Sequence, residues 1–172
     1  MPGSAVDYGY IDPAWVVSPT GLTANSNDYA YWEFSGASNY EGWSLINWAG
    51  WSVNGGTLFI DPSGTDPHIK SPELFVDASV LKYLKFSMAS NAADAKGQIF
   101  FKTASENDYN PDKIINFTVQ NNGQFKDYSI PLTHQKWTGK ITGIRIDPAE
   151  AGVGGTNTDT IGWHWIRLSQ NP

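Results

Sequence analysis

The run Lys113-Ile114-Ile115-Asn116-Phe117-Thr118-Val119-Gln120 alternates apolar and polar residues, and the pair Asn122-Gly123 follows it closely. Successive side chains of an extended strand point to opposite faces, so Ile115, Phe117 and Val119 share one face and the polar residues take the other. An Asn-Gly pair favours the positive φ angles of tight turns. This segment therefore predicts a half-buried β-strand that ends in a turn.

Working outward from it, short β-branched or aromatic runs recur between clusters of Gly, Pro, Asn and Asp. We expect strands at Thr57–Ile60, Tyr83–Met88, Gln98–Lys102, Lys113–Gln120, Phe125–Ile130, Ile141–Ile146 and Ile161–Leu168, with further turns at Gly55-Gly56 and Gly154-Gly155. No segment keeps a helical period, and Ala89–Ala95 would form one helical turn at most. The pattern predicts an all-β fold, a two-sheet antiparallel β-sandwich of the jelly-roll type.

The chain has 172 residues, which suits one domain with its own core. Residues 1–4 have the character of a cloning remnant, and we expect residues 5–172 to form a single domain that acts as a monomer. No stretch approaches the roughly 20 apolar residues of a membrane span, so no membrane association is expected. The absence of cysteine excludes disulfides and thiolate metal sites.

Charge and aromatic content narrow the function. The net charge is −6 and the basic residues are scattered, which disfavours a nucleic-acid binder. Aromatic residues make up 14% of the chain and include eight tryptophans. Exposing tryptophan to water is unfavourable, so these side chains either fill a core or form a binding surface.

Alternation along the expected strands predicts one polar sheet face. Ile144 and Ile146 point inward, whereas Arg145 points outward. One sheet is therefore expected to display Lys85, Gln98, Lys102, Asn116 and Arg145 on its outer face. Long polar side chains of this kind bind sugar hydroxyls, although an ordinary solvated sheet face would have the same pattern.

Three aromatic groups are candidates for ring stacking on sugars. Trp48 and Trp51 flank Ala49-Gly50 and are expected on a loop with Tyr40 beside them, either as a binding platform or as a cap on the sandwich. Trp163 and Trp165 are expected to share one face of the last strand, with His164 on the other, as a ligand wall or as core. Tyr109 on a polar loop is a surface candidate. We assign Trp43 and Trp137 to the core.

Catalytic and metal sites have weaker support. The five glutamates are isolated, and no carboxylate pair, nucleophile motif or histidine-rich motif is present. Oxygen ligands for calcium are available in loops, with Glu33, Glu41 and Asp61 as the candidate ligands of a structural Ca²⁺. Asp28, Asp66 and Asp159 complete that inventory, and solvated loop acids are the alternative.

Several short motifs occur in an order that resembles a known family. They are Trp32-Glu33-Phe34, Glu41-Gly42-Trp43, Asn54–Leu58, Asp66–Pro72, Phe125–Tyr128, Trp137–Ile141, Ile144–Pro148 and Ile166–Leu168. This order is similar to that of β-jelly-roll carbohydrate-binding modules appended to bacterial glycanases, including enzymes that degrade xanthan and β-glucan. The resemblance implies a non-catalytic, extracellular module, often with a structural calcium. Its relatives commonly have an aspartate where this chain has His164, which removes one calcium ligand.

The sequence therefore predicts a secreted bacterial module that binds a polysaccharide, either β-glucan or a related glycan such as xanthan. It would target an appended glycoside hydrolase or polysaccharide lyase to that polymer. Two alternatives remain: a small polysaccharide-active enzyme, and a structural or adhesive sandwich without a sugar site.

Overall fold

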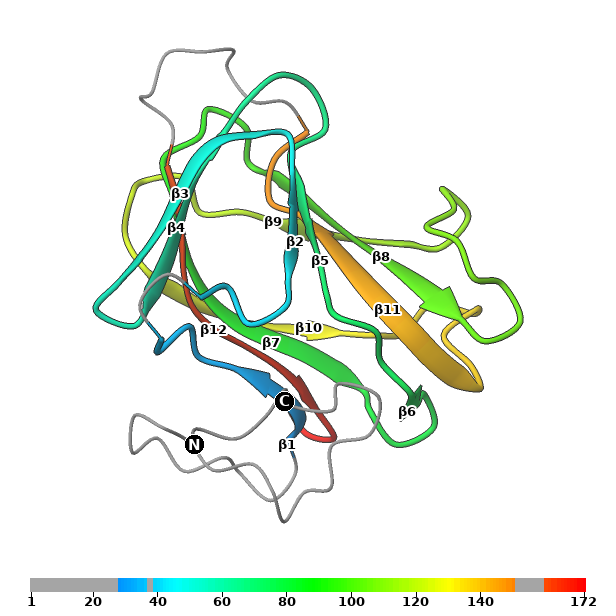
Figure 1. Cartoon of the computed structure of the whole chain (residues 1–172). Helices are drawn as coiled ribbons and strands as arrows, with labels where there is room; N and C mark the ends of the chain where they lie inside the picture. The colour runs from blue at the N-terminus through cyan, green and yellow to red at the C-terminus, as the bar shows by residue number, and fades with distance from the viewer. Residues whose placement is uncertain (1–27, 37–38, 151–159) are drawn as a thin grey trace.

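The computed structural model describes residues 28–36, 39–150 and 160–172. Within these ranges the chain forms strands and no helix (Figure 1). The strands are β1 (Asp28–Trp32), β2 (Ser44–Ile46), β3 (Trp48–Asn54), β4 (Thr57–Pro62), β5 (His68–Lys70), β6 (Val76–Asp77), β7 (Tyr83–Ser90), β8 (Lys96–Thr103), β9 (Ile114–Thr118), β10 (Lys126–Pro131), β11 (Lys140–Asp147) and β12 (Ile161–Ser169).

Two six-stranded antiparallel sheets make up the sandwich (Figure 1). Sheet I has the order β10-β7-β12-β4-β3, and β1 also pairs with β12. Sheet II has the order β2-β5-β11-β8-β9, and β6 also pairs with β11. The expected two-sheet β-sandwich is confirmed.

All seven strands expected from alternation are present, with ends that differ by a few residues. The structure adds β1, β2, β3, β5 and β6, which alternation did not reveal. No helical turn forms at Ala89–Ala95, because its first two residues continue β7. The predicted turn at Gly154-Gly155 and the predicted remnant at residues 1–4 lie outside the described residues.

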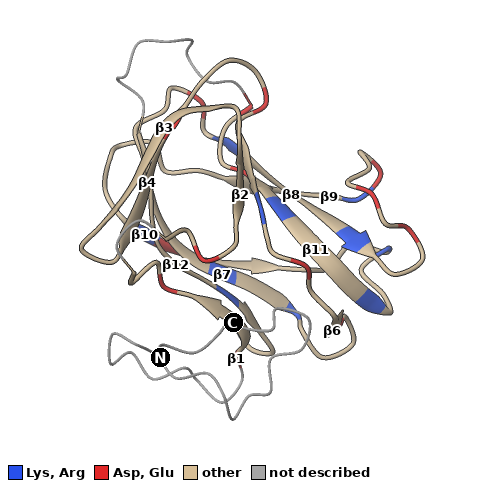
Figure 2. Cartoon of the chain, viewed as in Figure 1, with Lys and Arg blue, Asp and Glu red and all other residues tan. Residues whose placement is uncertain are grey.

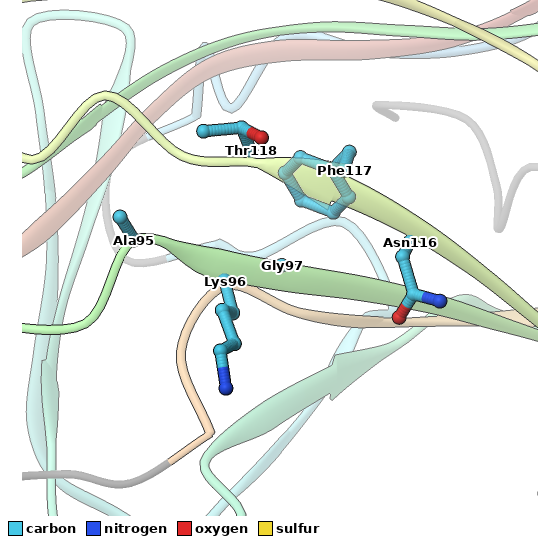
Figure 3. Close-up of a pocket in the computed structure, with 6 residues that line it drawn as sticks. All are labelled: Ala95, Lys96, Gly97, Asn116, Phe117 and Thr118. Carbon is cyan, nitrogen blue, oxygen red and sulfur yellow. The ribbon is translucent and has the colours of Figure 1, made fainter.

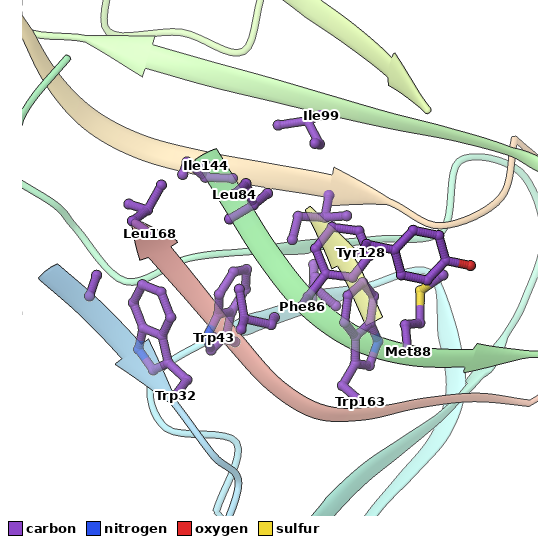
Figure 4. Close-up of a cluster of buried hydrophobic side chains, with 14 of the residues drawn as sticks. Trp32, Trp43, Leu84, Phe86, Met88, Ile99, Tyr128, Ile144, Trp163 and Leu168 are labelled. Atoms are coloured by element: carbon purple, nitrogen blue, oxygen red, sulfur yellow. The ribbon is translucent and has the colours of Figure 1, made fainter. Parts of the chain in front are cut away.

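The core lies between the two sheets, and its side chains come from the inward positions of both (Figure 4). Leu84, Phe86 and Met88 of β7 are fully buried, as alternation predicts. Burying a side chain of this size contributes about 1.5–3 kcal/mol to folding. The predicted core positions Trp43 and Trp137 are both confirmed as buried.

One close contact sets the spacing between β8 and β9. The Phe117 ring lies directly over Gly97, and a Cβ atom at that position would stand 2.2 Å from the ring (Figure 3). Any larger residue at position 97 would therefore displace the ring. Together with Lys96 and Asn116, the pair borders a hollow of about 270 Å³ at this side of sheet II.

Among the described residues, no helix is long and apolar enough to cross a membrane.

Candidate functional site

The outer face of sheet II brings together four of the five residues that were expected on one sheet face. The fifth, Lys85, lies on β7 of sheet I, which corrects the expectation. Cross-strand pairing sets Lys102 opposite Gly143, Phe100 opposite Arg145, and Gln98 opposite both Asp147 and Asn116. Directly opposed residues share a face, so these side chains lie on one surface. The Gln98 amide donates a hydrogen bond to Asn116 Oδ1 at 3.2 Å. We call this surface the polar face; its residues are Lys70, Gln98, Lys102, Tyr109, Asn116 and Arg145.

Three of the basic residues lie on this face: Lys70, Lys102 and Arg145. Figure 2 shows lysine and arginine along β5, β8 and β11 of sheet II. Lys70 of β5 is paired with Arg145 of β11, which adds it to the polar face. The sequence argument missed Lys70 because a three-residue strand shows no alternation.

Arg145 is held in the middle of the polar face by an aromatic ring and two carboxylates. Its guanidinium lies 4.5 Å from the centroid of Phe100. Its Nε donates to Asp147 Oδ1 at 2.7 Å, and its second nitrogen pairs with both Asp147 and Asp66. Such paired, charge-assisted contacts leave this side chain little freedom.

The same cluster shifts three pKa values. Burial raises the pKa of Asp147 to about 6, although Arg145 acts in the opposite direction. Burial alone would lower the pKa of Arg145, but its bonds to Asp147 and Asp66 outweigh burial and raise it. Burial lowers the pKa of His68, whose Nδ1 donates to the Asp66 carbonyl at 2.8 Å. His68 is therefore a neutral, structural side chain at pH 7.

Tyr109 is the aromatic ring of the polar face. It lies across Gly143, where an added Cβ atom would stand 2.7 Å from the tyrosine oxygen and from Lys102 Cε. Burial raises the pKa of the Tyr109 hydroxyl to about 12. The Nζ atoms of Lys70 and Lys102 each lie 5.5 Å from the ring centroid. The predicted surface tyrosine is thus part of the same surface as the predicted polar residues.

A buried lysine anchors the loop that carries Tyr109, residues 104–113. The Lys113 side chain has no solvent exposure. Its Nζ donates to the Glu106 carbonyl at 3.0 Å and pairs with Asp108 at 2.7 Å and Glu106 Oε2 at 3.2 Å. The sequence argument placed Lys113 at the start of a strand and gave no reason to expect this anchor.

Trp48 and Trp51 lie on β3 and not on a loop, which corrects the expectation. The pairing of β3 with β4 shifts by one residue between Trp48 and Gly50. After this shift Trp51 lies opposite the buried Ile60. Both rings therefore point to the core side of sheet I, at its edge strand. They border an edge cleft of about 330 Å³, lined by Tyr40, Gly42, Trp43, Ser44, Leu45, Trp48 and Trp51.

Within the edge cleft only part of the aromatic surface is open. Trp51 is 44% exposed and meets Tyr40 edge to face, with centroids 4.8 Å apart. The Trp48 indole is half-buried and donates to the His68 carbonyl at 2.9 Å. The cleft thus offers Trp51 and Tyr40 to a ligand, while Trp48 joins β3 to β5.

In the last strand, the expectation that Trp163 and Trp165 share one face is wrong, and of the two alternatives for Trp163 the core position holds. Trp163 is fully buried and packs 5.4 Å from Phe86, so it cannot form a ligand wall (Figure 4). A register shift between Trp163 and Trp165 reverses the alternation and sends Trp165 to the outer face of sheet I. There Trp165 lies against Arg167, and His164 stacks on Phe125 at 3.5 Å.

The three predicted calcium ligands do not converge as one group of carboxylates among the described residues. Glu41 accepts backbone N–H groups of Glu33 and Ser35, whereas Glu33 lies 3.8 Å from Arg167. Asp61 accepts a hydrogen bond from the Thr160 hydroxyl. Each of these three carboxylates thus has a protein partner. Of the other candidate acids, Asp28 and Asp66 pair with arginines. Asp159 lies outside the described residues.

In the described ranges, one group of metal-ligand type does converge: Asp66, His68 and Asp147. The Arg145 guanidinium is bonded to both carboxylates of this group. A cation would have to displace that charge, so the residues present do not fit a metal.

No family model matches the sequence, and no curated protein matches it. The fold does match solved structures. An arginine-to-alanine variant of a family 29 carbohydrate-binding module has a TM-score of 0.54 at 17% identity, over 83% of this chain and 93% of that chain. A lysine-to-alanine variant in complex with cellulohexaose has a TM-score of 0.55 at 14% identity, over 86% and 94%.

A low-affinity xylan-binding module of family 86, from Roseburia intestinalis, has a TM-score of 0.51 at 10% identity, over 79% of this chain and 95% of that chain. At these identities the likeness concerns the fold. The chain therefore has the β-sandwich fold of carbohydrate-binding modules of families 29 and 86.

Proposed function

We propose that this chain is a non-catalytic carbohydrate-binding module that holds a polysaccharide on its polar face. The observation that carries the proposal is Tyr109, a flat ring on an outer sheet face with amide and cationic side chains around it. An aromatic ring covers the apolar C–H face of a pyranose, while Gln98 and Asn116 pair with hydroxyls at the ring edge. Such a ring contact contributes about 1–3 kcal/mol, estimated from the area that one sugar covers.

The arrangement of β11 supports the polar face over the edge cleft. In the family 29 module, an arginine and an aspartate two positions apart were each replaced by alanine to probe the mechanism of ligand recognition. Arg145 and Asp147 also stand two positions apart and lie on the polar face. The bound cellulohexaose of that module makes a β-glucan the first ligand to test.

A non-catalytic role agrees with the state of the carboxylates. A glycosidase needs one carboxyl group as acid and a second as base or nucleophile across the scissile bond. On the polar face Asp66 and Asp147 both bind the Arg145 guanidinium, which keeps them engaged with one cation. The module would act by concentrating an appended hydrolase or lyase on its polymer, outside the cell.

Tyr109→Ala tests this proposal. Isothermal titration and affinity electrophoresis with β-glucan, xylan and xanthan should show binding by the unchanged chain. The variant should bind at least tenfold more weakly, which equals about 1.4 kcal/mol. Phe125→Ala is the matched control, because it removes an exposed aromatic ring that lies over β12 of sheet I, away from the polar face. Trp51→Ala tests the edge cleft separately.

Three outcomes would contradict the proposal. Binding to none of the polymers would favour a structural or adhesive sandwich. Release of reducing ends or unsaturated products by the isolated chain would favour an enzyme. Loss of affinity in Trp51→Ala and not in Tyr109→Ala would move the site to the edge cleft.

Structural calcium stays a prediction, and its alternative, solvated loop acids, predicts that adding the ion has no effect on stability. The melting temperature with 1 mM-scale calcium should then match the value with EDTA, because Arg145 already neutralises Asp66 and Asp147. A rise in the melting temperature on adding calcium would show that another set of oxygens binds the ion.

A further inference from the structure

The polar face carries two lysines that no carboxylate neutralises. In the described part of the chain, Lys96 pairs with Glu150, Lys140 with Asp77, and Arg145 with two aspartates. Lys113 and Lys136 likewise pair with acidic residues of the Tyr109 loop. Among the described residues, five lysines have no such partner within 4 Å, although the chain carries a net charge of −6. Lys82, Lys85 and Lys126 lie on or beside sheet I, whereas Lys70 and Lys102 lie together on the polar face.

These two ammonium groups share one aromatic ring. Each lies 5.5 Å from the Tyr109 centroid, and the ring covers Gly143 of β11, the strand between β5 and β8. Lys70 and Lys102 therefore reach the ring from the two strands that flank β11. A sugar stacked on Tyr109 would bring a charged substituent within reach of either ammonium group.

From this juxtaposition we infer that the polysaccharide bound here carries carboxylate groups, as uronic acids or acidic ketals do. The inference rests on the proposed function and specifies the ligand of the same site. Sugar hydroxyls are satisfied by the amides of Gln98 and Asn116 and do not need two unpaired cations. A carboxylate on the ligand would supply a negative charge next to Lys70 and Lys102, which have no carboxylate partner within the described protein.

The number of cations fits a sparsely charged glycan. A nucleic acid or a densely sulfated polymer needs a continuous basic stripe, because each phosphate or sulfate must be neutralised in turn. Here Asp66 and Asp147 lie against Arg145 of the same face and would repel such a polymer. Two unpaired lysines suit a repeating unit with about one carboxylate near each bound sugar.

Two polymers with the same β-glucan backbone provide the test. Carboxymethylcellulose carries carboxylates and hydroxyethylcellulose does not; xanthan serves as a natural acidic glycan. We expect carboxymethylcellulose and xanthan to bind at least fivefold more tightly than hydroxyethylcellulose at low salt. The advantage should shrink as salt is added, because salt screens exposed charges.

The variants Lys70→Gln and Lys102→Gln should each lower the affinity for the acidic polymers by about three- to tenfold. The double variant should bind all three polymers with the same affinity. Lys126→Gln is the matched control: its Nζ also lies over a tyrosine ring, Tyr128 at 5.1 Å, but on sheet I. It changes the net charge by the same amount and should leave the preference intact.

The results separate the two proposals. Equal affinity of the unchanged chain for charged and uncharged glucan would overturn the inference and leave the module a glucan binder. An acidic preference that survives the double variant, or that Lys126→Gln abolishes, would also overturn it. Binding to none of the three polymers would overturn the proposed function itself.

Discussion

Arg167 lies between the rings of Tyr31 and Trp165, with its guanidinium carbon 4.6 Å from each centroid. Its nitrogens face the carboxylates of Asp28 at 3.5 Å and Glu33 at 3.8 Å, and both carboxylates are almost fully buried. Removing one partner of a buried ion pair is costly, because the remaining charge stays in a poorly solvated place.

Arg167→Ala should therefore lower the free energy of unfolding by about 3–5 kcal/mol, measured by urea denaturation. Binding to the polar face should not change, since Arg167 lies on the other sheet. Lys126→Gln, an exposed charge change, should cost less than about 0.5 kcal/mol. A cost for Arg167→Ala as small as that of this control would mean that Asp28 and Glu33 do not depend on the arginine.

Asp147 makes stability depend on pH. Burial raises the pKa of this carboxyl from 3.8 to about 6. The folded state therefore holds the proton more strongly than the unfolded state does. The stability that this group contributes is complete below about pH 4, and it is lost as the pH rises through about 6.

Asp147→Asn removes that titration. The difference in unfolding free energy between the unchanged chain and the variant should fall by about 1–3 kcal/mol between pH 4 and pH 7. Urea denaturation at half-unit pH steps measures it. Parallel stability profiles for the two proteins would show that Asp147 titrates normally.

At the scale of the elements, strand length decided what the sequence could reveal. β7, β8, β11 and β12 have eight or nine residues each, which is enough for alternation to identify the strand and its inner face. β2, β5 and β6 have two or three residues and show no period. β5 and β6 pair with the longer β11, and β2 pairs with β5. These short strands thus depend on backbone hydrogen bonds from a neighbouring strand, a tertiary effect that local sequence does not record.

Irregular pairing accounts for the errors about tryptophan. One extra residue in β12 sends Trp165 outward and leaves Trp163 in the core, where strict alternation would have given both one face. In β3 the shift near Ala49-Gly50 made a strand look like a loop. The polar face was predictable, because Gln98, Lys102 and Arg145 lie on long strands. That Lys70 and the Tyr109 loop also belong to this face could be seen only in the folded structure.

The Tyr109 loop supplies a prediction at the same scale. Lys113→Met keeps the buried side-chain volume and removes the donor to the Glu106 carbonyl and the pair with Asp108. We expect a loss of about 1–3 kcal/mol in stability and a loss of affinity close to that of Tyr109→Ala, since the loop no longer holds the ring. Calorimetry and hydrogen exchange of the loop amides measure both effects.

Lys136→Met is the matched control for this loop. Lys136 pairs with the same Glu106 at 3.6 Å but is partly exposed, so its loss should change stability by less than about 1 kcal/mol. An unchanged affinity in a destabilised Lys113→Met protein would show that Tyr109 keeps its place without the anchor.

Over the whole molecule, the tryptophans divide between core and surface. Trp32, Trp43, Trp137 and Trp163 are buried, whereas Trp51 is exposed and Trp48 and Trp165 are half-buried. The eighth, Trp15, lies outside the described residues. Most of the described indole surface therefore stabilises the sandwich, and the rings that we propose for ligand contact are Tyr109 on one face and Trp51 at one edge.

These two places adjoin each other. Ser44 lines the edge cleft and is paired with Lys70 of the polar face across β2 and β5. Neighbouring strands are about 4.8 Å apart, so a polymer that crosses sheet II from β8 toward β2 reaches the cleft within a few strands. A long chain can then contact Tyr109 and Trp51 together, whereas a short one reaches only one of them.

Affinity should accordingly increase with oligosaccharide length, and contact with Trp51 should account for most of the increase. For the unchanged chain, calorimetry with a matched series of two to six sugars should give a rise of about tenfold or more between the shortest and the longest. Trp51→Ala should bind the shortest sugars normally and lose most of that rise, because only the longer ones reach the cleft. Tyr109→Ala should weaken every member of the series. If Trp51→Ala instead keeps the full length dependence, the polymer runs across the polar face without turning into the cleft.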